Sequence, residues 1–265
     1  MSQPADRALH DRLVARLPVL VGEVMSGAFA TEAKGDDGLD FVTSVDLALQ
    51  RALEDELAAL LPGSVVTGEE GYTAARGDAP VWLVDPLDGT VNFVAGLPSY
   101  AVAVALTIDG RTVLSAVHDI RHETTYSALS RQGAFVKGAP LARRDHPAKL
   151  ATLSSGLMKD LATHAPAALA AMLNSFKLRN VGSQALHLCY AAAGHLSLVA
   201  SREAKGWDDM AGALIAQEAG LRYGHYHGGD TPPVDRDQFS LCAEPALFEE
   251  YASVLAGSLG PVIAN

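Results

Sequence analysis

Acidic side chains follow directly after a strongly apolar run near residue 85. The run Val81-Trp82-Leu83-Val84 ends in Asp85-Pro86-Leu87-Asp88-Gly89-Thr90. Such an apolar run is typical of a buried strand, so both carboxylates are expected at the open end of that strand. Pro86 fixes its own φ and favours an extended Asp85, and the chain is expected to turn there. Two carboxylates at such a turn suit a divalent cation that prefers oxygen ligands.

The residues after this turn can begin a helix. Asp88 is the candidate cap, and the backbone amides of Gly89 and Thr90 are then free to bind a phosphate oxygen. An ordinary acidic turn is the alternative interpretation, because Asp, Gly and Pro are common in all turns. The segment alone therefore leaves two interpretations open, a site for a metal-bound phosphate and a solvated turn.

Three further acidic segments lie on either side of this turn. They are Asp40-Phe41-Val42-Thr43-Ser44-Val45-Asp46, Gly68-Glu69-Glu70-Gly71 and Gly206-Trp207-Asp208. In this order, the four segments resemble the signature of the inositol monophosphatase family, the magnesium-dependent, lithium-sensitive sugar and polyol phosphatases. The resemblance extends from Asp40 to at least Asp208, which is most of the chain.

The resemblance implies a set of metal ligands. It assigns one ion to Glu69, Asp85 and the Leu87 carbonyl, and another to Asp85, Asp88 and Asp208. Two or three Mg²⁺ ions per active site are expected, with Mn²⁺ as a substitute. The family uses the first glutamate of its pair, hence Glu69, but the sequence leaves an exchange with Glu70 open.

The resemblance also implies catalytic roles for Asp46, Thr90 and Glu69. Asp46 and Thr90 would orient the attacking water, and no covalent intermediate would form. The aspartates of the central turn stand three apart, at positions 85 and 88. This spacing differs from the Asp-x-Asp-Gly-Thr motif of haloacid dehalogenase phosphatases, which supplies a nucleophilic aspartate. A purely structural alternative exists for Asp46, because the helix dipole favours a carboxylate in a first helical turn.

Several residues are candidates for binding the substrate. The amides of Gly89 and Thr90 would bind phosphate, and Gly182-Ser183 resembles the Gly-Thr of the family's substrate loop. Inositol-selective members carry a Glu where this chain has Ser201, and a His or Arg where it has Lys205. An inositol 1-phosphate type of substrate is favoured, while fructose 1,6-bisphosphate and histidinol phosphate remain alternatives because Arg202 and Lys205 add positive charge.

Composition limits the remaining functions. The chain has 265 residues, of which 49% are hydrophobic and 19% charged, and its net charge is -11. This charge argues against nucleic acid or an anionic membrane as a partner, and favours a small phosphorylated metabolite that binds through recruited cations. Two cysteines in apolar segments and the absence of a secretory signal or membrane span predict a cytoplasmic protein. Homodimerisation is implied only by the resemblance.

The order of predicted elements indicates a two-lobed α+β protein. Helices over 9–29 and 44–61, the second with Ser44 as its candidate cap, precede short strands and an antiparallel meander over 100–141, with an Asp-Gly hairpin at 109–110. Strands and helices alternate in the second half, including one alanine-rich helix expected at 159–173, and this alternation predicts an α/β layer. We therefore expect an N-terminal lobe at 1–143 with most metal ligands, and a C-terminal α/β lobe at 144–265 with the substrate loop and Asp208. The resemblance implies the layered α-β-α-β-α sugar phosphatase fold. A non-catalytic, metal- or phosphate-binding regulatory subunit with this fold is the alternative of a different class.

Overall fold

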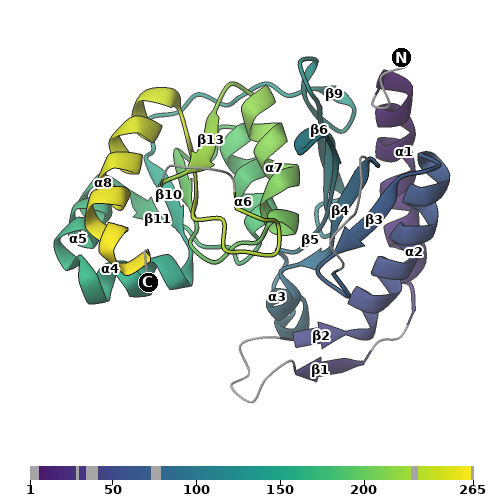
Figure 1. Ribbon diagram of the computed structural model, residues 1–265, viewed down its shortest axis with the longest axis horizontal. Helices are drawn as coiled ribbons and strands as arrows, with labels where there is room; N and C mark the ends of the chain where they lie inside the picture. Colours follow the sequence, from purple (N-terminus) through teal and green to yellow (C-terminus); the bar gives the residue numbers. More distant parts are fainter. Residues whose placement is uncertain (1–5, 28–29, 34–40, 73–78, 228–231, 264–265) are drawn as a thin grey trace.

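Two β-sheets alternate with three layers of helices in the computed structural model, which describes residues 6–27, 30–33, 41–72, 79–227 and 232–263 (Figure 1). Asp40, the first residue of the predicted signature, lies outside these ranges. The helices are α1 (Arg7–Met25), α2 (Ser44–Leu60), α3 (Thr90–Ala95), α4 (Ser155–His164), α5 (Pro166–Ser175), α6 (Gln184–Ala192), α7 (Gly206–Glu218) and α8 (Pro245–Ile263). The strands are β1 (Thr31–Ala33), β2 (Phe41–Thr43), β3 (Val65–Gly68), β4 (Val81–Asp88), β5 (Ala101–Ile108), β6 (Arg111–Asp119), β7 (Thr124–Leu129), β8 (Gly133–Val136), β9 (Ala139–Pro140), β10 (Leu150–Leu153), β11 (Lys177–Leu178), β12 (Leu198–Ala200), β13 (Arg222–His225) and β14 (Ser240–Ala243).

The first large sheet has the strand order β3-β4-β5-β6-β7-β8-β9, and the second has the order β11-β10-β12-β14-β13. From β4 to β9 neighbouring strands pair antiparallel, as the predicted meander requires, while β3 and β4 pair parallel. The second sheet is mixed, because β10 is parallel to β11 and β12 whereas β14 is antiparallel to both of its neighbours. A further two-stranded ribbon joins β1 and β2.

Three hydrophobic cores hold the layers together. Helices α1 and α2 pack on one face of the first sheet, α6 and α7 fill the space between the sheets, and α4, α5 and α8 cover the outer face of the second sheet. This arrangement confirms the layered α-β-α-β-α fold that was expected (Figure 1). Whether residues 1–143 and 144–265 behave as separate lobes stays a prediction.

Side chains alternate along the strands of the first sheet, so each face of this sheet packs into a different hydrophobic core. On β4, Trp82 and Val84 face α1 and α2, while Leu83 faces α6 and α7. Such a period of two is expected wherever both faces of a strand are buried. On β5 the residues toward α7 are alanines, Ala101, Ala103 and Ala105. Their small side chains allow α7 to lie close to the strands that carry the candidate site.

Three local predictions were wrong. Thr43, not Ser44, caps α2, and its hydroxyl accepts from the amides of Val45 and Asp46. Gly89 with φ 97°, not Asp88, is the N-cap of α3, because Asp88 still pairs with β5 after the bulge in β4. The single helix expected at 159–173 is two helices, since Pro166 cannot donate a backbone hydrogen bond and instead begins α5.

Candidate active site

A bulge at the end of β4 places the two central aspartates. Asp85 pairs with Ala103 and Asp88 with Ala101, so three steps along β4 oppose two along β5. The extra residue bends the strand and re-aims the side chains that follow it. Both aspartates are buried, with 2% and 8% of their surface exposed. A solvated turn is therefore excluded at this point.

Asp85 lies at the electrostatic centre of four carboxylates, which we call the acidic cluster: Glu69, Asp85, Asp88 and Asp208. Burial, together with the negative charges of the other three, raises the pKa of the Asp85 carboxyl well above its usual value. The amide of Leu87 donates to Asp85 Oδ1 at 3.0 Å and opposes this rise only in part. Like charges in a poorly solvated place disfavour full ionisation unless a cation joins them.

Asp88 lies at the N-terminus of α6. Its Oδ2 accepts from the Ser183 hydroxyl at 2.6 Å and from the Ala185 amide at 2.7 Å, and its Oδ1 accepts from the Gln184 amide at 3.2 Å. A helix N-terminus favours a carboxylate through its free amides and its dipole. Burial nevertheless raises the pKa of Asp88 to about 6. The predicted substrate residue Ser183 thus contacts Asp88 directly.

Asp208 reaches the acidic cluster from the first turn of α7. The amide of Lys205 donates to its Oδ2 at 2.7 Å, which anchors the side chain at the start of the helix. Burial, and next the charge of Asp88, raise the pKa of Asp208 well above its usual value. Because α7 lies between the two sheets, this carboxylate brings a segment far along the chain to the end of β4 (Figure 1).

Glu69 follows β3 directly. Its amide donates to the Val84 carbonyl at 3.2 Å, which holds the end of β3 beside β4. Gly68 makes this approach possible, because a Cβ at that position would lie 2.2 Å from the Val84 oxygen. The negative charge of Glu69 contributes to the raised pKa of Asp85, Asp88 and Asp208. This electrostatic effect supports Glu69 as a member of the cluster, and the exchange with Glu70 stays open.

Asp46 and Thr90 are brought together by a hydrogen bond. The Thr90 hydroxyl lies 2.9 Å from Asp46 Oδ1 and 2.9 Å from the Leu87 carbonyl. Asp46 Oδ2 accepts from the amide and the hydroxyl of Thr43, at 2.8 and 2.5 Å. Asp46 thus completes the capping box of α2 with one oxygen and contacts Thr90 with the other. Both the structural and the catalytic interpretation of its motif fit this geometry.

The donor set suits a hard divalent cation. The acidic cluster and the Leu87 carbonyl offer only oxygen ligands, which Mg²⁺ prefers. Within the described residues, no three acidic, His or Cys side chains stand in a ready-made metal-binding arrangement. Two of the carboxylates instead accept hydrogen bonds from helix starts. The raised pKa values of Asp85 and Asp208 are the physical sign that positive charge would be stabilising here.

The predicted substrate residues adjoin this cluster to different degrees. A cavity of about 230 Å³ is lined by Asp88, Ser154, Ser155, Asn180, Gly182, Ser183, Gln184, His187, Ser201, Glu203, Ala204 and Asp208. Gly182, Ser183 and Ser201 therefore lie at this cavity. Gly89 lies against it indirectly, since a Cβ there would be 3.2 Å from the Gly182 carbonyl. Lys205 does not line the cavity, and its Nζ lies 2.5 Å from Asp237.

Sequence reasoning missed several residues that shape the site. Asn92 donates to the carbonyls of Ser99 and Val181 at 2.7 and 2.6 Å, which ties α3 to the loop that precedes α6. Gln184 donates to Asp209 Oδ1 at 2.7 Å, which links α6 to α7. No local sequence pattern predicts contacts between residues that are so far apart in the chain. The one local signal is Asp209 in Trp207-Asp208-Asp209. A charged residue on an otherwise apolar helix needs a hydrogen-bonding partner, so this carboxylate predicts a contact with another element.

Comparison with known proteins is consistent with this arrangement. The profile of the inositol monophosphatase family matches residues 12–258. This chain is 37% identical to the inositol-1-monophosphatase SuhB of Mycobacterium tuberculosis over 238 residues, 82% of each chain. The chain belongs to the inositol monophosphatase family. Membership makes it a phosphatase, an enzyme that hydrolyses phosphoric monoesters.

Two further proteins are similar to this chain, one in sequence and one in structure. The Nus factor SuhB of Escherichia coli K12 is 34% identical over 206 residues, which is 76% of this chain and 77% of that protein. The solved IMPase of Thermotoga maritima superposes with a TM-score of 0.80 at 25% identity, covering 95% of this chain and 98% of that one. In the described part of this inositol monophosphatase family member, no helix is long and apolar enough to cross a membrane.

Proposed function

We propose that this phosphatase hydrolyses the phosphate monoester of a small polyol or sugar, of the inositol 1-phosphate type, with Mg²⁺ as cofactor. The single observation that carries the proposal is the environment of Asp85. It is buried, and Glu69, Asp88 and Asp208 raise its pKa. Such a concentration of negative charge repels an anionic ester unless cations are recruited, so the acidic cluster fits a metal-dependent phosphatase better than a metal-free one.

The proposed ligands are those of the expected set. Glu69, Asp85 and the Leu87 carbonyl would hold one ion, and Asp85, Asp88 and Asp208 another. When bound, Mg²⁺ supplies an activated water nucleophile and neutralises charge on the phosphate and on the leaving oxygen. Mn²⁺ as a substitute, a third ion, inhibition by lithium, a cytoplasmic location and a homodimer are proposals that rest on family membership.

The residues around the cluster have separate roles in this proposal. The Thr90 hydroxyl has one proton and two acceptors at 2.9 Å, Asp46 and the Leu87 carbonyl. While it donates to one of them, its lone pairs can accept from the attacking water, so Thr90 and Asp46 would fix the direction of attack. Asp46 is itself held by two bonds from Thr43. Rigid positioning of this kind is what in-line displacement requires.

The substrate would lie between the acidic cluster and the polar wall of the cavity. The amides of Gly89 and Thr90 would bind phosphate oxygens at the start of α3. Gly182, Ser183 and Ser201 would face the rest of the ester. Lys205 was expected to contribute as well, but its ion pair with Asp237 leaves it a weak candidate.

A panel of esters tests the substrate assignment. Phosphate release is measured with Mg²⁺ from inositol 1-phosphate, fructose 1,6-bisphosphate, histidinol phosphate and 3'-phosphoadenosine 5'-phosphate. The proposal expects the highest kcat/KM for inositol 1-phosphate. A preference of tenfold or more for another ester would reject the polyol assignment while keeping the phosphatase.

A second, non-catalytic role deserves a direct test because one relative is named a Nus factor. The candidate function is that of a regulatory subunit which binds a protein partner without turnover. If turnover is not the function, Asp46→Asn, which changes a proposed catalytic residue and no metal ligand, would abolish turnover and leave binding of the partner intact. If hydrolysis is the function, the same variant loses function together with turnover.

A further inference from the structure

Three carboxylates line the cavity that would receive the substrate: Asp88, Asp208 and Glu203. Among the described residues that line it, there is no lysine or arginine. The one imidazole is that of His187, and burial lowers its pKa to about 4, which keeps it neutral at physiological pH. Asp88 and Asp208 belong to the acidic cluster. Glu203 does not, and its position away from that cluster needs another explanation.

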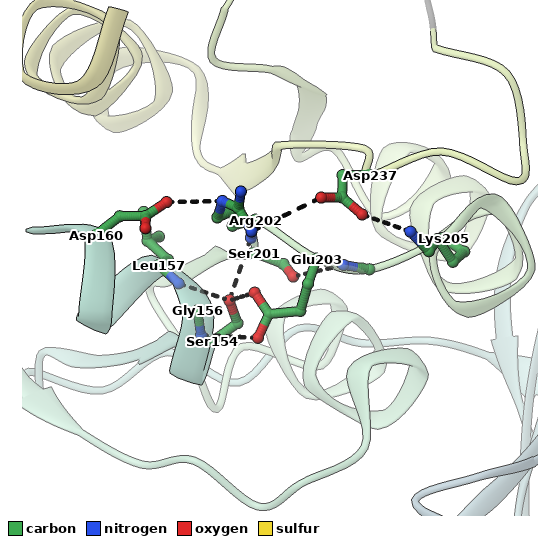
Figure 2. A network of polar contacts seen from close by, with 10 residues as sticks. Ser154, Gly156, Leu157, Asp160, Ser201, Arg202, Glu203, Lys205 and Asp237 are labelled. Atoms are coloured by element: carbon green, nitrogen blue, oxygen red, sulfur yellow. Dashed lines mark hydrogen bonds and ion pairs between the residues drawn. The ribbon is translucent and has the colours of Figure 1, made fainter. Parts of the chain in front are cut away.

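Glu203 is bound to the start of α4. Its Oε2 accepts from the Ser154 hydroxyl at 2.5 Å and its Oε1 accepts from the Gly156 amide at 2.8 Å (Figure 2). Ser154 is the N-cap of this helix. Gly156 leaves the room for the carboxylate, since a Cβ there would lie 2.6 Å from Glu203 Oε2. The donors that could have bound a second phosphate at this helix start are therefore occupied by a side chain of the protein.

The cations next to Glu203 are also engaged. Arg202 lies between two carboxylates, with Nε 2.7 Å from Asp160 and Nη1 3.8 Å from Asp237 (Figure 2). Lys205 Nζ lies 2.5 Å from Asp237 on the side opposite Arg202. Their positive charge is compensated within this network, so it does not offer the second anion site that Arg202 and Lys205 suggested in the sequence.

We propose that the cavity selects phosphate esters whose leaving group carries no second negative charge, and that Glu203 is the specificity-determining residue. This inference rests on the proposed function and narrows it to neutral polyol leaving groups. Each Glu203 oxygen has a lone pair left after its bond to α4, so it can accept from a substrate hydroxyl. A phosphate at the same place would meet a fixed carboxylate, and like charges in contact select strongly against a partner.

The test compares two substrates in three proteins. Kcat/KM with Mg²⁺ is measured for inositol 1-phosphate and for fructose 1,6-bisphosphate in the natural protein, in Glu203→Gln and in Glu218→Gln. Glu218 is the matched control, because its carboxylate also accepts two hydrogen bonds, from the amides of Arg131 and Gly133 at 2.7 and 2.8 Å, but does not line this cavity. Thermal unfolding of each protein verifies that it is folded.

The natural protein is expected to prefer the monophosphate by about tenfold or more. Glu203→Gln should reduce this preference by about tenfold, and Glu218→Gln should leave it unchanged. Glu203→Ala, which frees the Ser154 hydroxyl and the Gly156 amide, should favour the bisphosphate further. This second variant keeps the test decisive if the glutamine variant is poorly folded.

Three results would overturn the inference, and they distinguish its failure from failure of the proposed function. Equal use of both esters by the natural protein, or an unchanged preference in both Glu203 variants, rejects the role of Glu203 and keeps the proposed phosphatase. Absence of magnesium-dependent hydrolysis with every ester of the panel rejects the proposed function, and the inference with it.

Discussion

Thr90 connects two parts of the candidate active site through one hydroxyl group. It contacts Asp46, on α2, and the Leu87 carbonyl at the end of β4. A residue that merely stabilised the fold would lose only the net value of a hydrogen bond when replaced, about 1 kcal/mol. Replacement of a residue that directs the attacking water would lower kcat as well. The two roles can be separated by measurement.

Thr90→Val is therefore expected to lower kcat by roughly 100-fold with a much smaller effect on KM, because positioning matters in the transition state. Thr107→Val is the matched control, since the Thr107 hydroxyl donates to the Val81 carbonyl at 3.1 Å, at the other end of β4. Steady-state kinetics and urea unfolding of both variants make the comparison. Equal loss of stability with unchanged kcat in both variants would reduce Thr90 to a structural role.

At the scale of elements, the start of α6 is the part of the site that the sequence indicates least. Gly182 has φ 78°, and a Cβ there would lie 2.6 Å from Asn92 Nδ2. The close approach lets Asn92 donate to the Val181 carbonyl, which fixes the loop before Ser183. The geometry of the loop thus depends on Asn92, which lies 89 positions before Val181 in the chain.

Gly182→Ala should lower the free energy of unfolding by about 2–3 kcal/mol, since it adds a clash to the cost of a positive φ. It should also lower kcat/KM by about tenfold or more, because Ser183 and Asp88 move with the loop. Gly138→Ala isolates the backbone cost, because Gly138 has φ 77° and open space around it. Gly138→Ala should lower the free energy of unfolding by about 1 kcal/mol and leave kcat/KM unchanged. Similar effects of the two substitutions on kcat/KM would contradict the account of this loop.

His187, which also lies on α6, makes the free energy of unfolding depend on pH. Its Nε2 accepts from the Val181 amide at 2.9 Å, which requires the neutral form. Burial lowers its pKa from 6.5 to about 4 in the folded protein, so the unfolded chain binds more protons between these values. Stability from this group is therefore present above pH 6.5 and is lost as the pH falls toward 4, by about 3 kcal/mol at most.

Unfolding of the natural protein and of His187→Asn across pH 4–7 tests this dependence. The difference in unfolding free energy between the two proteins should shrink steadily as the pH falls, since only the natural protein has this group. Other titrating groups, including the acidic cluster, occur in both and cancel in the difference. A difference that is constant across the range would contradict the lowered pKa.

The sequence predicted the elements better than their ends. Periodicity placed α1, α2 and the meander, and the motif Val42–Asp46 correctly set a carboxylate into the first turn of α2. Both Thr43 and Ser44 are good caps, and pattern alone could not choose between them. Pro86 was expected to end the strand, but it lies in a bulge, and pairing with β5 resumes at Asp88.

At the scale of the whole molecule, the acidic cluster exists because the layers are stacked. Glu69 and the two aspartates come from the ends of neighbouring strands in the first sheet, and Asp208 comes from a helix between the sheets. The order of motifs along the chain indicated that these residues belong together. It could not indicate Glu203, whose contacts with Ser154 and Gly156 span 49 and 47 positions.

The central claim is that this convergence of carboxylates recruits the cation that makes hydrolysis possible. The most direct test measures phosphate release from inositol 1-phosphate after exhaustive chelation, and again after Mg²⁺ is restored. It compares the natural protein with Asp85→Asn and with the control Asp55→Asn. Asp55 is a suitable control because it is exposed on α2. The account predicts that chelation abolishes release, and that Mg²⁺ restores it in the natural protein and in Asp55→Asn but not in Asp85→Asn. Full turnover after chelation, or near-normal turnover in Asp85→Asn, would contradict it.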